Sequence, residues 1–322
     1  MSETANGRVA LVTGGAGFIG GHLTERLVGD GWKVRVIDDF SSGRDSNLAG
    51  CVDRIELIRG DIRDADTVAR AADGVEVVFH QAAVPSVPRS VAEPVRTNSV
   101  NIGGTLEVLE AARAAGVRRV VYAASSSAYG DTEVLPKVET MEANPLSPYA
   151  LQKYAGERYC HLYTELYGLE TVALRYFNIF GPRQDPKSQY AAVIPRFATA
   201  ALADEPAEIY GDGEQTRDFT FVADAVRANL LAADAPRANG QVINIAGGRR
   251  TSLNQLWHEI CDLVGVAIDA RHASPRPGDV RDSLAGLDRA GELLDYAPEI
   301  DLRTGLLRTI ESLRTASETQ KG

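Results

Sequence analysis

The 322-residue sequence has few of the side chains that build disulfide or metal frameworks. Its three cysteines, Cys51, Cys160 and Cys261, are far apart and odd in number, and neither a C-x-x-C spacing nor a histidine cluster occurs. This pattern predicts idle thiols in a reducing compartment and no metal site. Long apolar runs are also missing, because none approaches the roughly 20 residues of a membrane-spanning helix.

Positive charge is scarce as well. Lysine and arginine total 34 against 44 acidic residues, a net charge of −10, which disfavours non-specific binding to nucleic acid. Residues 1–6 are polar and lack the basic start, apolar middle and cleavage site of a secretory signal. We therefore expect a cytoplasmic protein with a small-molecule partner, not one that binds nucleic acid or a membrane.

The first half of the chain alternates apolar runs with helical patterns. We expect strands at residues 8–13, 33–37, 55–58, 75–79, 120–124 and 171–176, with helices at 17–28, 65–71, 95–115 and 149–167. Strands that are apolar on both faces and alternate with helices indicate an α/β fold, a Rossmann-type doubly wound parallel sheet.

The second half is less regular. Residues 181–190 form a polar loop, 193–204 have a helical pattern, 241–245 have a strand pattern, and 274–282 form a basic loop rich in proline and glycine. We expect residues 1–178 to form the Rossmann domain, with segments of roughly 218–246 returning to it. Residues 179–322 then form a smaller, discontinuous C-terminal lobe.

A glycine-rich turn follows the first expected strand. Gly14, Gly17 and Gly20 are spaced three apart between that strand and a helix. Such a triplet also fits an ordinary tight turn, but here an acidic residue ends the next strand, as in dinucleotide-binding domains. The glycines allow the backbone to approach a pyrophosphate at the helix N-terminus. Asp38 can bind the adenosine ribose and repel a 2′-phosphate, which favours NAD over NADP, although the nearby Arg44 is a counter-signal.

Asp61 and Ile62 follow the third expected strand. This position suits a contact with adenine. A helix cap at Asp61 is an equally good interpretation of the same residue.

A tyrosine and a lysine lie one helical turn apart in a later segment. Ser147 and Pro148 suit the start of a helix, and Tyr149 and Lys153 then share one face. A neighbouring ammonium group favours the phenolate and so lowers the pKa of the phenol, which makes it a usable base. The pair alone is common on surface helices, so its meaning depends on the other motifs.

Taken together, these motifs resemble those of the extended short-chain dehydrogenases/reductases. Within that family the chain is similar to nucleotide-sugar 4-epimerases that act on substrates of the UDP-N-acetylglucosamine and UDP-galactose types. The resemblance runs from Val9 to about Leu307 and includes the glycine triplet, Ser125-Ser126-Ser127-Ala128-Tyr129-Gly130, Ser147-Pro148-Tyr149-x-x-x-Lys153, Leu174-Arg175-Tyr176-Phe177-Asn178, Gly213-x-x-x-Arg217-Asp218 and Arg276-Pro277-Gly278-Asp279.

The resemblance implies NAD-dependent epimerisation at C4 of a UDP-hexose through a transient 4-keto sugar. Tyr149 is then the base, Lys153 its cationic neighbour, and Ser125 the hydroxyl that assists them, although Ser126 is near enough to replace Ser125. Relatives that remove water carry an Asp-Glu pair after this hydroxyl residue. This chain has Ser126-Ser127 there, which disfavours dehydration.

The same resemblance implies two sets of binding residues. Those for NAD are Gly14, Gly17, Phe18, Ile19, Gly20, Asp38, Asp39, Asp61, Ile62, Gln81, Ala82, Ala83, Tyr149, Lys153 and Tyr176. Those for the UDP-sugar are Ser86, Arg89, Ser126, Ser127, Asn178, Ala192, Val193, Arg217, Arg276, Asp279 and Ser283. Arg217 and Arg276 suit the diphosphate, because a guanidinium offers its donors as a fixed fork, although surface ion pairs are an ordinary use of arginine.

Ser283 occupies the position that limits the sugar in the resembling enzymes. A bulky tyrosine there excludes an N-acetyl group, whereas a small residue admits it. We therefore expect UDP-N-acetylglucosamine and UDP-N-acetylgalactosamine as substrates, with UDP-glucose and UDP-galactose also open. Ser86 and Arg89 are expected near the sugar or a uronate carboxylate, with simple loop structure as the alternative.

Two other functions remain open on this scaffold. One is a UDP-glucuronate 4-epimerase or decarboxylase, and the other a non-catalytic NAD-sensing regulator, which the retained Tyr149 and Lys153 make improbable. The helices expected at 95–115 and 149–167 carry apolar and small residues on more than one face. By resemblance they predict a homodimer formed through a four-helix bundle.

Overall fold

The computed structural model describes residues 7–185, 192–274 and 280–319. Seven parallel strands form its central sheet, in the order β11-β6-β5-β4-β1-β2-β3. They are β1 (Val9–Thr13), β2 (Lys33–Asp38), β3 (Ile55–Arg59), β4 (Val77–His80), β5 (Arg119–Ser125), β6 (Glu170–Tyr176) and β11 (Gln241–Ile245). This is the order of a dinucleotide-binding sheet with one strand added beyond the sixth, which confirms the predicted fold class.

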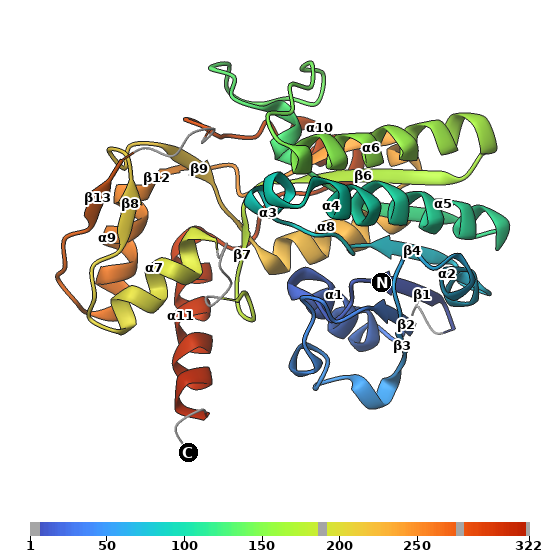
Figure 1. The fold of residues 1–322 in the computed structure, drawn as a ribbon, viewed down its shortest axis with the longest axis horizontal. Helices are drawn as coiled ribbons and strands as arrows, with labels where there is room; N and C mark the ends of the chain where they lie inside the picture. Colours follow the sequence, from blue (N-terminus) through green and yellow to red (C-terminus); the bar gives the residue numbers. More distant parts are fainter. Residues whose placement is uncertain (1–6, 186–191, 275–279, 320–322) are drawn as a thin grey trace.

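Helices cover both faces of the sheet (Figure 1). Neighbouring residues of a strand point to opposite faces, so Leu11 packs in one core while Ala10 and Val12 pack in the other. The core of Ala10 and Val12 includes side chains of α1 (Phe18–Gly29) and α8 (Val222–Asp234). The core of Leu11 includes side chains of α2 (Ala65–Ala72), α5 (Thr105–Ala114) and α6 (Pro148–Tyr167).

The helix expected at residues 95–115 is present, but its middle part is wider than a regular α-helix. The structure has α4 (Pro94–Asn98), a π-helical turn (Ser99–Gly104) and then α5. Asn101 lies in that turn, where its Oδ1 accepts from the Val84 backbone N–H at 2.7 Å and its Nδ2 donates to Gln152 at 2.8 Å. These buried side-chain bonds fix the widened turn, and such turns are frequent at functional sites.

The C-terminal segments build a smaller layer beside the sheet (Figure 1). Its helices α7 (Val193–Leu202), α9 (Leu253–Val264) and α11 (Leu302–Thr319) pack around Phe197 and Trp257, whose rings meet edge to face at 5.6 Å. Two short strand pairs complete it, namely β8 (Glu208–Tyr210) with β13 (Arg271–Ala273) and β9 (Thr216–Asp218) with β12 (Arg250–Ser252).

The remaining elements of the described ranges are short. They are the helices α3 (Val87–Ala92) and α10 (Asp288–Leu294), the paired strands β7 (Ile179–Phe180) and β10 (Thr220–Phe221), and four 3₁₀ turns (Asp45–Asn47, Val52–Arg54, Ser126–Tyr129 and Pro236–Ala238). Across the described ranges, every helix is too short or too polar to cross a membrane.

Candidate active site

A cavity of about 1340 Å³ lies at the carboxyl ends of the strands and is lined by residues from both layers. Ligands of open α/β sheets bind outside these strand ends. Pockets for one drug-sized molecule usually measure roughly 300–1000 Å³. This cavity therefore has room for a dinucleotide and a second ligand together.

The glycine turn after β1 forms one wall of this cavity. Gly14 has φ +68°, and a Cβ there would lie 2.7 Å from the Ala82 Cα. A Cβ on Gly20 would lie only 2.1 Å from the Gly14 carbonyl oxygen. Gly17 is the N-cap of α1, and no side chain caps the helix. The N-terminal N–H groups of α1 thus face a turn into which a pyrophosphate fits closely, as dinucleotide binding requires.

Asp38 ends β2 and lines the cavity with only 7% of its surface exposed. Its carboxylate accepts from the backbone N–H groups of Ala16 at 2.9 Å and Phe40 at 2.8 Å. Burial raises its pKa, and the two backbone hydrogen bonds oppose that rise. Arg44 forms an ion pair with Asp185 in place of Asp38. The structure therefore holds a fixed carboxylate in the cavity wall.

Asp39, Asp61 and Ile62 also line this part of the cavity. Asp39 is exposed and accepts from the Ser41 N–H and hydroxyl. The carboxylate of Asp61 binds the backbone N–H and guanidinium of Arg63, which lowers the Asp61 pKa. Helix α2 has Asp64 at its N-cap. The alternative of a helix cap at Asp61 is therefore wrong.

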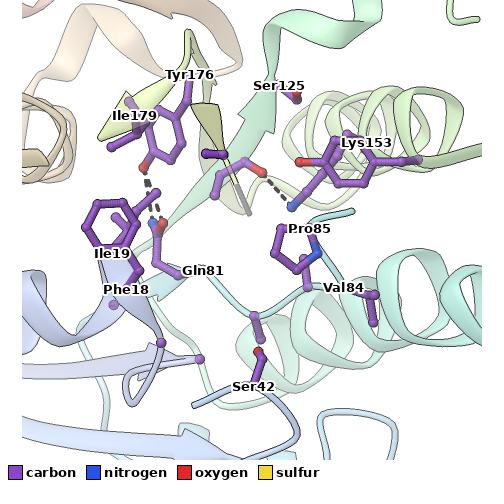
Figure 2. Close-up of a pocket in the computed structure, with 18 of the residues that line it drawn as sticks. Phe18, Ile19, Ser42, Gln81, Val84, Pro85, Ser125, Lys153, Tyr176 and Ile179 are labelled. Atoms are coloured by element: carbon purple, nitrogen blue, oxygen red, sulfur yellow. Dashed lines mark hydrogen bonds between the residues drawn. The ribbon is translucent and has the colours of Figure 1, made fainter. Parts of the chain in front are cut away.

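Gln81 and Tyr176 meet across the cavity floor (Figure 2). The Gln81 side-chain amide donates to the Tyr176 hydroxyl at 3.2 Å and to the buried Asn229 at 3.0 Å. Asn229 in turn donates to the same hydroxyl at 2.7 Å. These hydrogen bonds link the residue after β4 to β6 and α8. They hold the three side chains in fixed positions relative to one another. Phe18, Ile19, Ala82 and Ala83, all expected at the cofactor, line the same cavity.

Helix α6 carries Tyr149 and Lys153 on one face, and both line the cavity. The Ser147 hydroxyl caps the helix by accepting from the Ala150 N–H at 3.2 Å, and Pro148 occupies its first position. The Tyr149 N–H donates to the Ser90 hydroxyl at 3.0 Å, which ties α6 to α3. The first turn of α6 is therefore fixed by side chains on both sides of Tyr149.

Lys153 is buried at the end of β5 (Figure 2). Its Nζ donates to the Ala123 carbonyl oxygen at 2.8 Å and lies 4.9 Å from the centre of the Tyr122 ring. Burial lowers the Lys153 pKa to about 8. The group is therefore mostly protonated at neutral pH and titrates not far above it.

Ser125 ends β5 and lies near enough to Tyr149 to affect its pKa. Its oxygen accepts from the Ser127 hydroxyl at 2.8 Å and from the Ser127 N–H at 3.2 Å. Burial raises the pKa of Tyr149, and interaction with the Ser125 hydroxyl opposes that rise. The sequence pattern led us to expect a pKa lowered by Lys153. Burial dominates instead, and a raised pKa favours the phenol over the phenolate.

Most of the residues expected at the UDP-sugar line the same cavity. They are Ser126, Ser127, Asn178, Ala192, Arg217 and Ser283. Val193 lines a smaller cavity of about 250 Å³ that shares Asn178, Ala192 and Arg217 with the first. Arg276 and Asp279 lie outside the described residues.

Ser86 and Arg89 are not among the residues that line either cavity. Ser86 is the N-cap of α3, where its hydroxyl accepts from the Arg89 N–H at 3.2 Å. Their neighbours Pro85, Val87 and Pro88 line the main cavity instead. The structure thus gives Ser86 the loop role that stood as the alternative.

The cavity also contains residues that the sequence motifs did not indicate, namely Arg96, Lys137, Arg183, Arg196 and Tyr210. None of these five residues belongs to a sequence motif, so the sequence alone did not predict that they line the cavity. Only the fold brings them to the same wall. Within the described ranges, no group of three or more His, Cys, Asp or Glu side chains could hold a metal ion.

Comparisons with known proteins agree with this geometry. Residues 10–246 match the NAD dependent epimerase/dehydratase family. A UDP-glucose 4-epimerase of Mycolicibacterium smegmatis is 43% identical to this chain, covering 96% of it and 99% of the relative.

Two solved structures are similar over nearly their whole length. A UDP-N-acetylglucosamine 4-epimerase from Methanobrevibacter ruminantium, in complex with UDP-N-acetylmuramic acid, has a TM-score of 0.93 and 40% identity, covering 97% of this chain and 99% of its own. A UDP-glucose 4-epimerase from Thermotoga maritima, with UDP-glucose, has a TM-score of 0.92 and 39% identity, covering 96% and 99%. The predicted resemblance is confirmed, and the chain belongs to the NAD-dependent epimerase/dehydratase family.

Proposed function

We propose that this protein interconverts the C4 epimers of a UDP-hexose. Its proposed substrates are UDP-N-acetylglucosamine and UDP-N-acetylgalactosamine, and it also accepts UDP-glucose and UDP-galactose. The observation that carries this proposal is the meeting of Tyr149, Lys153 and Ser125 in one cavity with a dinucleotide turn. The similarity to 4-epimerases of both substrate types supports it.

The residues of the glycine turn suit NAD, since an added Cβ on Gly14 or Gly20 would collide with backbone. Asp38 is proposed to bind the adenosine ribose, and Lys153 the ribose of the nicotinamide. When bound, NAD⁺ supplies a hydride acceptor for C4 of the sugar and returns the hydride to the opposite face. Everything else in the reaction falls to the side chains of this protein.

Tyr149 is the proposed base that takes the proton of the 4-hydroxyl and later returns it. Burial favours the phenol form of this group. The positive charge of bound NAD⁺, added to that of Lys153, would favour the phenolate. Ser125 is proposed to hold the substrate oxygen. Positioned acid–base groups of this kind typically contribute roughly 10²–10⁴-fold to the rate.

Ser126 and Ser127 follow Ser125 where an Asp-Glu pair would protonate a leaving hydroxyl. Both serines line the cavity and neither can supply that proton at neutral pH. The sugar is therefore oxidised and reduced at C4 without loss of water. A 4-keto sugar is the only intermediate that this reaction requires.

The enzyme must hold the nucleotide firmly and the sugar loosely, so that the keto sugar can turn over. Arg217, with Arg276, is proposed to hold the diphosphate, and Asp279 the uridine ribose. Asn178, Ala192 and Val193 are proposed to contact the nucleotide or the sugar. Ser283 is buried in the cavity wall, where its small side chain leaves room for an N-acetyl group.

The experiment that tests this proposal is incubation of the purified protein with UDP-glucose, UDP-N-acetylglucosamine and UDP-glucuronate in separate reactions. We expect C4 epimers of the first two and no net change in the NAD redox state. Carbon dioxide or UDP-galacturonate from the third would instead establish a uronate enzyme. No conversion of any of the three, together with full activity of Tyr149→Phe in cells, would establish an NAD-sensing regulator.

A homodimer is proposed as the working form. Helices α4 and α6 expose apolar side chains that include Val95 at 83%, Leu166 at 66% and Leu151 at 54%. Pairing of these helices with those of a second copy would cover this surface as a four-helix bundle. The mass in dilute solution tests this, and a clean monomer would contradict it.

A further inference from the structure

Lys137 lies in the wall of the main cavity, outside every motif that the sequence offered. Only 2% of its surface is exposed. Its Nζ donates to the Gly130 carbonyl oxygen at 3.0 Å. An ammonium group has three N–H donors, so this bond leaves two for another partner.

No carboxylate forms an ion pair with Lys137 among the residues that the structure describes. Asp131 and Asp282 are near enough to raise its pKa, yet burial lowers that pKa more, and the charge of Arg217 lowers it further. Asp131 accepts from the Arg281 N–H at 3.0 Å, and Asp282 accepts from the Thr216 hydroxyl. Lys137 is thus a buried cation beside a second cation, with its nearest acids engaged elsewhere.

The backbone holds this cation in a fixed place. The Lys137 N–H donates to the Leu284 carbonyl oxygen at 2.8 Å, and its own carbonyl accepts from the Gly286 N–H at 2.9 Å. These bonds run alongside Ser283, which lines the same wall. The Lys137 ammonium is therefore positioned on the substrate half of the cavity, away from the glycine turn.

Burial of an unpaired charge is costly, and an apolar residue in its place is often neutral or stabilising. The sequence contains only five lysines, and two of them, Lys137 and Lys153, line this one cavity. Lys137 forms no ion pair with a described acidic residue. A negatively charged ligand in the cavity would compensate its buried charge.

We infer that Lys137 binds the diphosphate of the sugar nucleotide together with Arg217. This inference rests on the proposed function, because it takes a UDP-sugar as the ligand. A compact ammonium group meets phosphate oxygens as a point charge, beside the planar fork of the arginine. The two cations then hold the charged part of the ligand, while the sugar beyond it remains able to turn.

The test is the affinity of UDP and of uridine for Lys137→Met, measured by calorimetry on the NAD-loaded protein. A hydrogen bond to a charged group predicts a loss of UDP affinity of roughly 10- to 100-fold, with uridine unchanged. Lys33→Met is the matched control, because Lys33 is exposed at the far end of β2. We expect its UDP affinity to equal that of the wild type.

Thermal unfolding separates this role from a structural one. Lys137→Met should melt no lower than the wild type without ligand, since it removes a buried charge. If this variant does not fold, Lys137→Gln replaces it, because glutamine keeps an N–H donor and removes the charge. We expect a smaller loss of UDP affinity for Lys137→Gln, again with uridine unchanged.

Two results would overturn the inference. One is unchanged UDP affinity, and the other is an equal loss of affinity for UDP and uridine. If the wild type binds no UDP at all, the proposed function itself fails.

Discussion

The two halves of the cavity are built by different means. In the half that contains the glycine turn, backbone segments pack directly against each other. A Cβ on Gly20 would lie 2.1 Å from the Gly14 carbonyl oxygen. Around the proposed UDP-sugar, side chains converge from distant segments, among them Lys137, Asn178, Arg217 and Ser283. A clash with backbone atoms cannot be relieved by a change of rotamer, whereas a clash with a side chain can. The cofactor half should therefore respond to small substitutions far more sharply than the substrate half.

The largest effect is expected from Gly20→Ala. The added Cβ would collide with the Gly14 carbonyl and with the Gly15 Cα at 2.9 Å, so the turn must open. NAD retention, measured by absorbance and mass of the purified protein, should be lost, or the protein should fail to fold. Gly29→Ala, in the same helix with nothing within 4 Å of the new Cβ, should retain NAD and near wild-type stability. Equal retention by both variants would contradict a backbone-built cofactor half.

The next largest effect is expected from Tyr149→Phe. Loss of the phenol oxygen removes the proposed base, and turnover should fall on the order of 10² or more. Ser125→Ala should cost less, because the phenol keeps its place in the first turn of α6. Initial rates with UDP-N-acetylglucosamine measure both. Since Tyr149 is also held through its backbone N–H by Ser90, neither variant should lower the melting temperature much. A larger loss for Ser125→Ala would reverse the assigned roles.

The cofactor half could be predicted from the sequence because its signals are local. The Gly14, Gly17 and Gly20 spacing and the acid at Asp38 lie within one βαβ unit. Tyr149 and Lys153 are likewise four residues apart on one helix. In each case a short local unit places the residues, so their spacing in the sequence indicates their geometry.

The rest of the site depends on tertiary contacts that no spacing encodes. The π-helical turn between α4 and α5 is stabilised by Asn101, whose partners Val84 and Gln152 lie 17 and 51 residues away in the chain. Lys137 reaches the cavity through pairing with residues 284–286. The pKa of Tyr149 was also misjudged, because burial, which the sequence does not show, outweighs the neighbouring lysine.

In the substrate half, Ser283→Tyr should alter substrate choice more than turnover. A phenol in place of the buried serine fills the space proposed for the N-acetyl group. Overpacking costs about 1–3 kcal/mol, which predicts a fall of roughly 10- to 100-fold in kcat/KM for UDP-N-acetylglucosamine. The value for UDP-glucose should change much less. Competition between the two substrates measures the ratio. An equal fall for both would show that Ser283 does not face the C2 substituent.

The smallest effect is expected from Asp38→Asn, which changes charge in the rigid half without adding volume. The amide oxygen can keep one of the bonds from Ala16 or Phe40, so the turn should hold. Loss of the carboxylate weakens one ribose contact and removes repulsion of a 2′-phosphate. The ratio of NADP⁺ to NAD⁺ affinity should therefore rise about tenfold, the size of one charge-assisted hydrogen bond.

Titration of the apoprotein with each cofactor measures that ratio, and Asp39→Asn, an exposed neutralisation one residue away, is the control. The pH dependence gives an independent check. Burial raises the Asp38 pKa, so acidification protonates the folded carboxyl earlier than an exposed one and mimics the substitution. NAD⁺ affinity should fall on acidification in the wild type and not in Asp38→Asn. If the variant keeps the wild-type ratio, Asp38 serves only the turn, and cofactor choice depends on the Arg44–Asp185 pair that lines the same cavity.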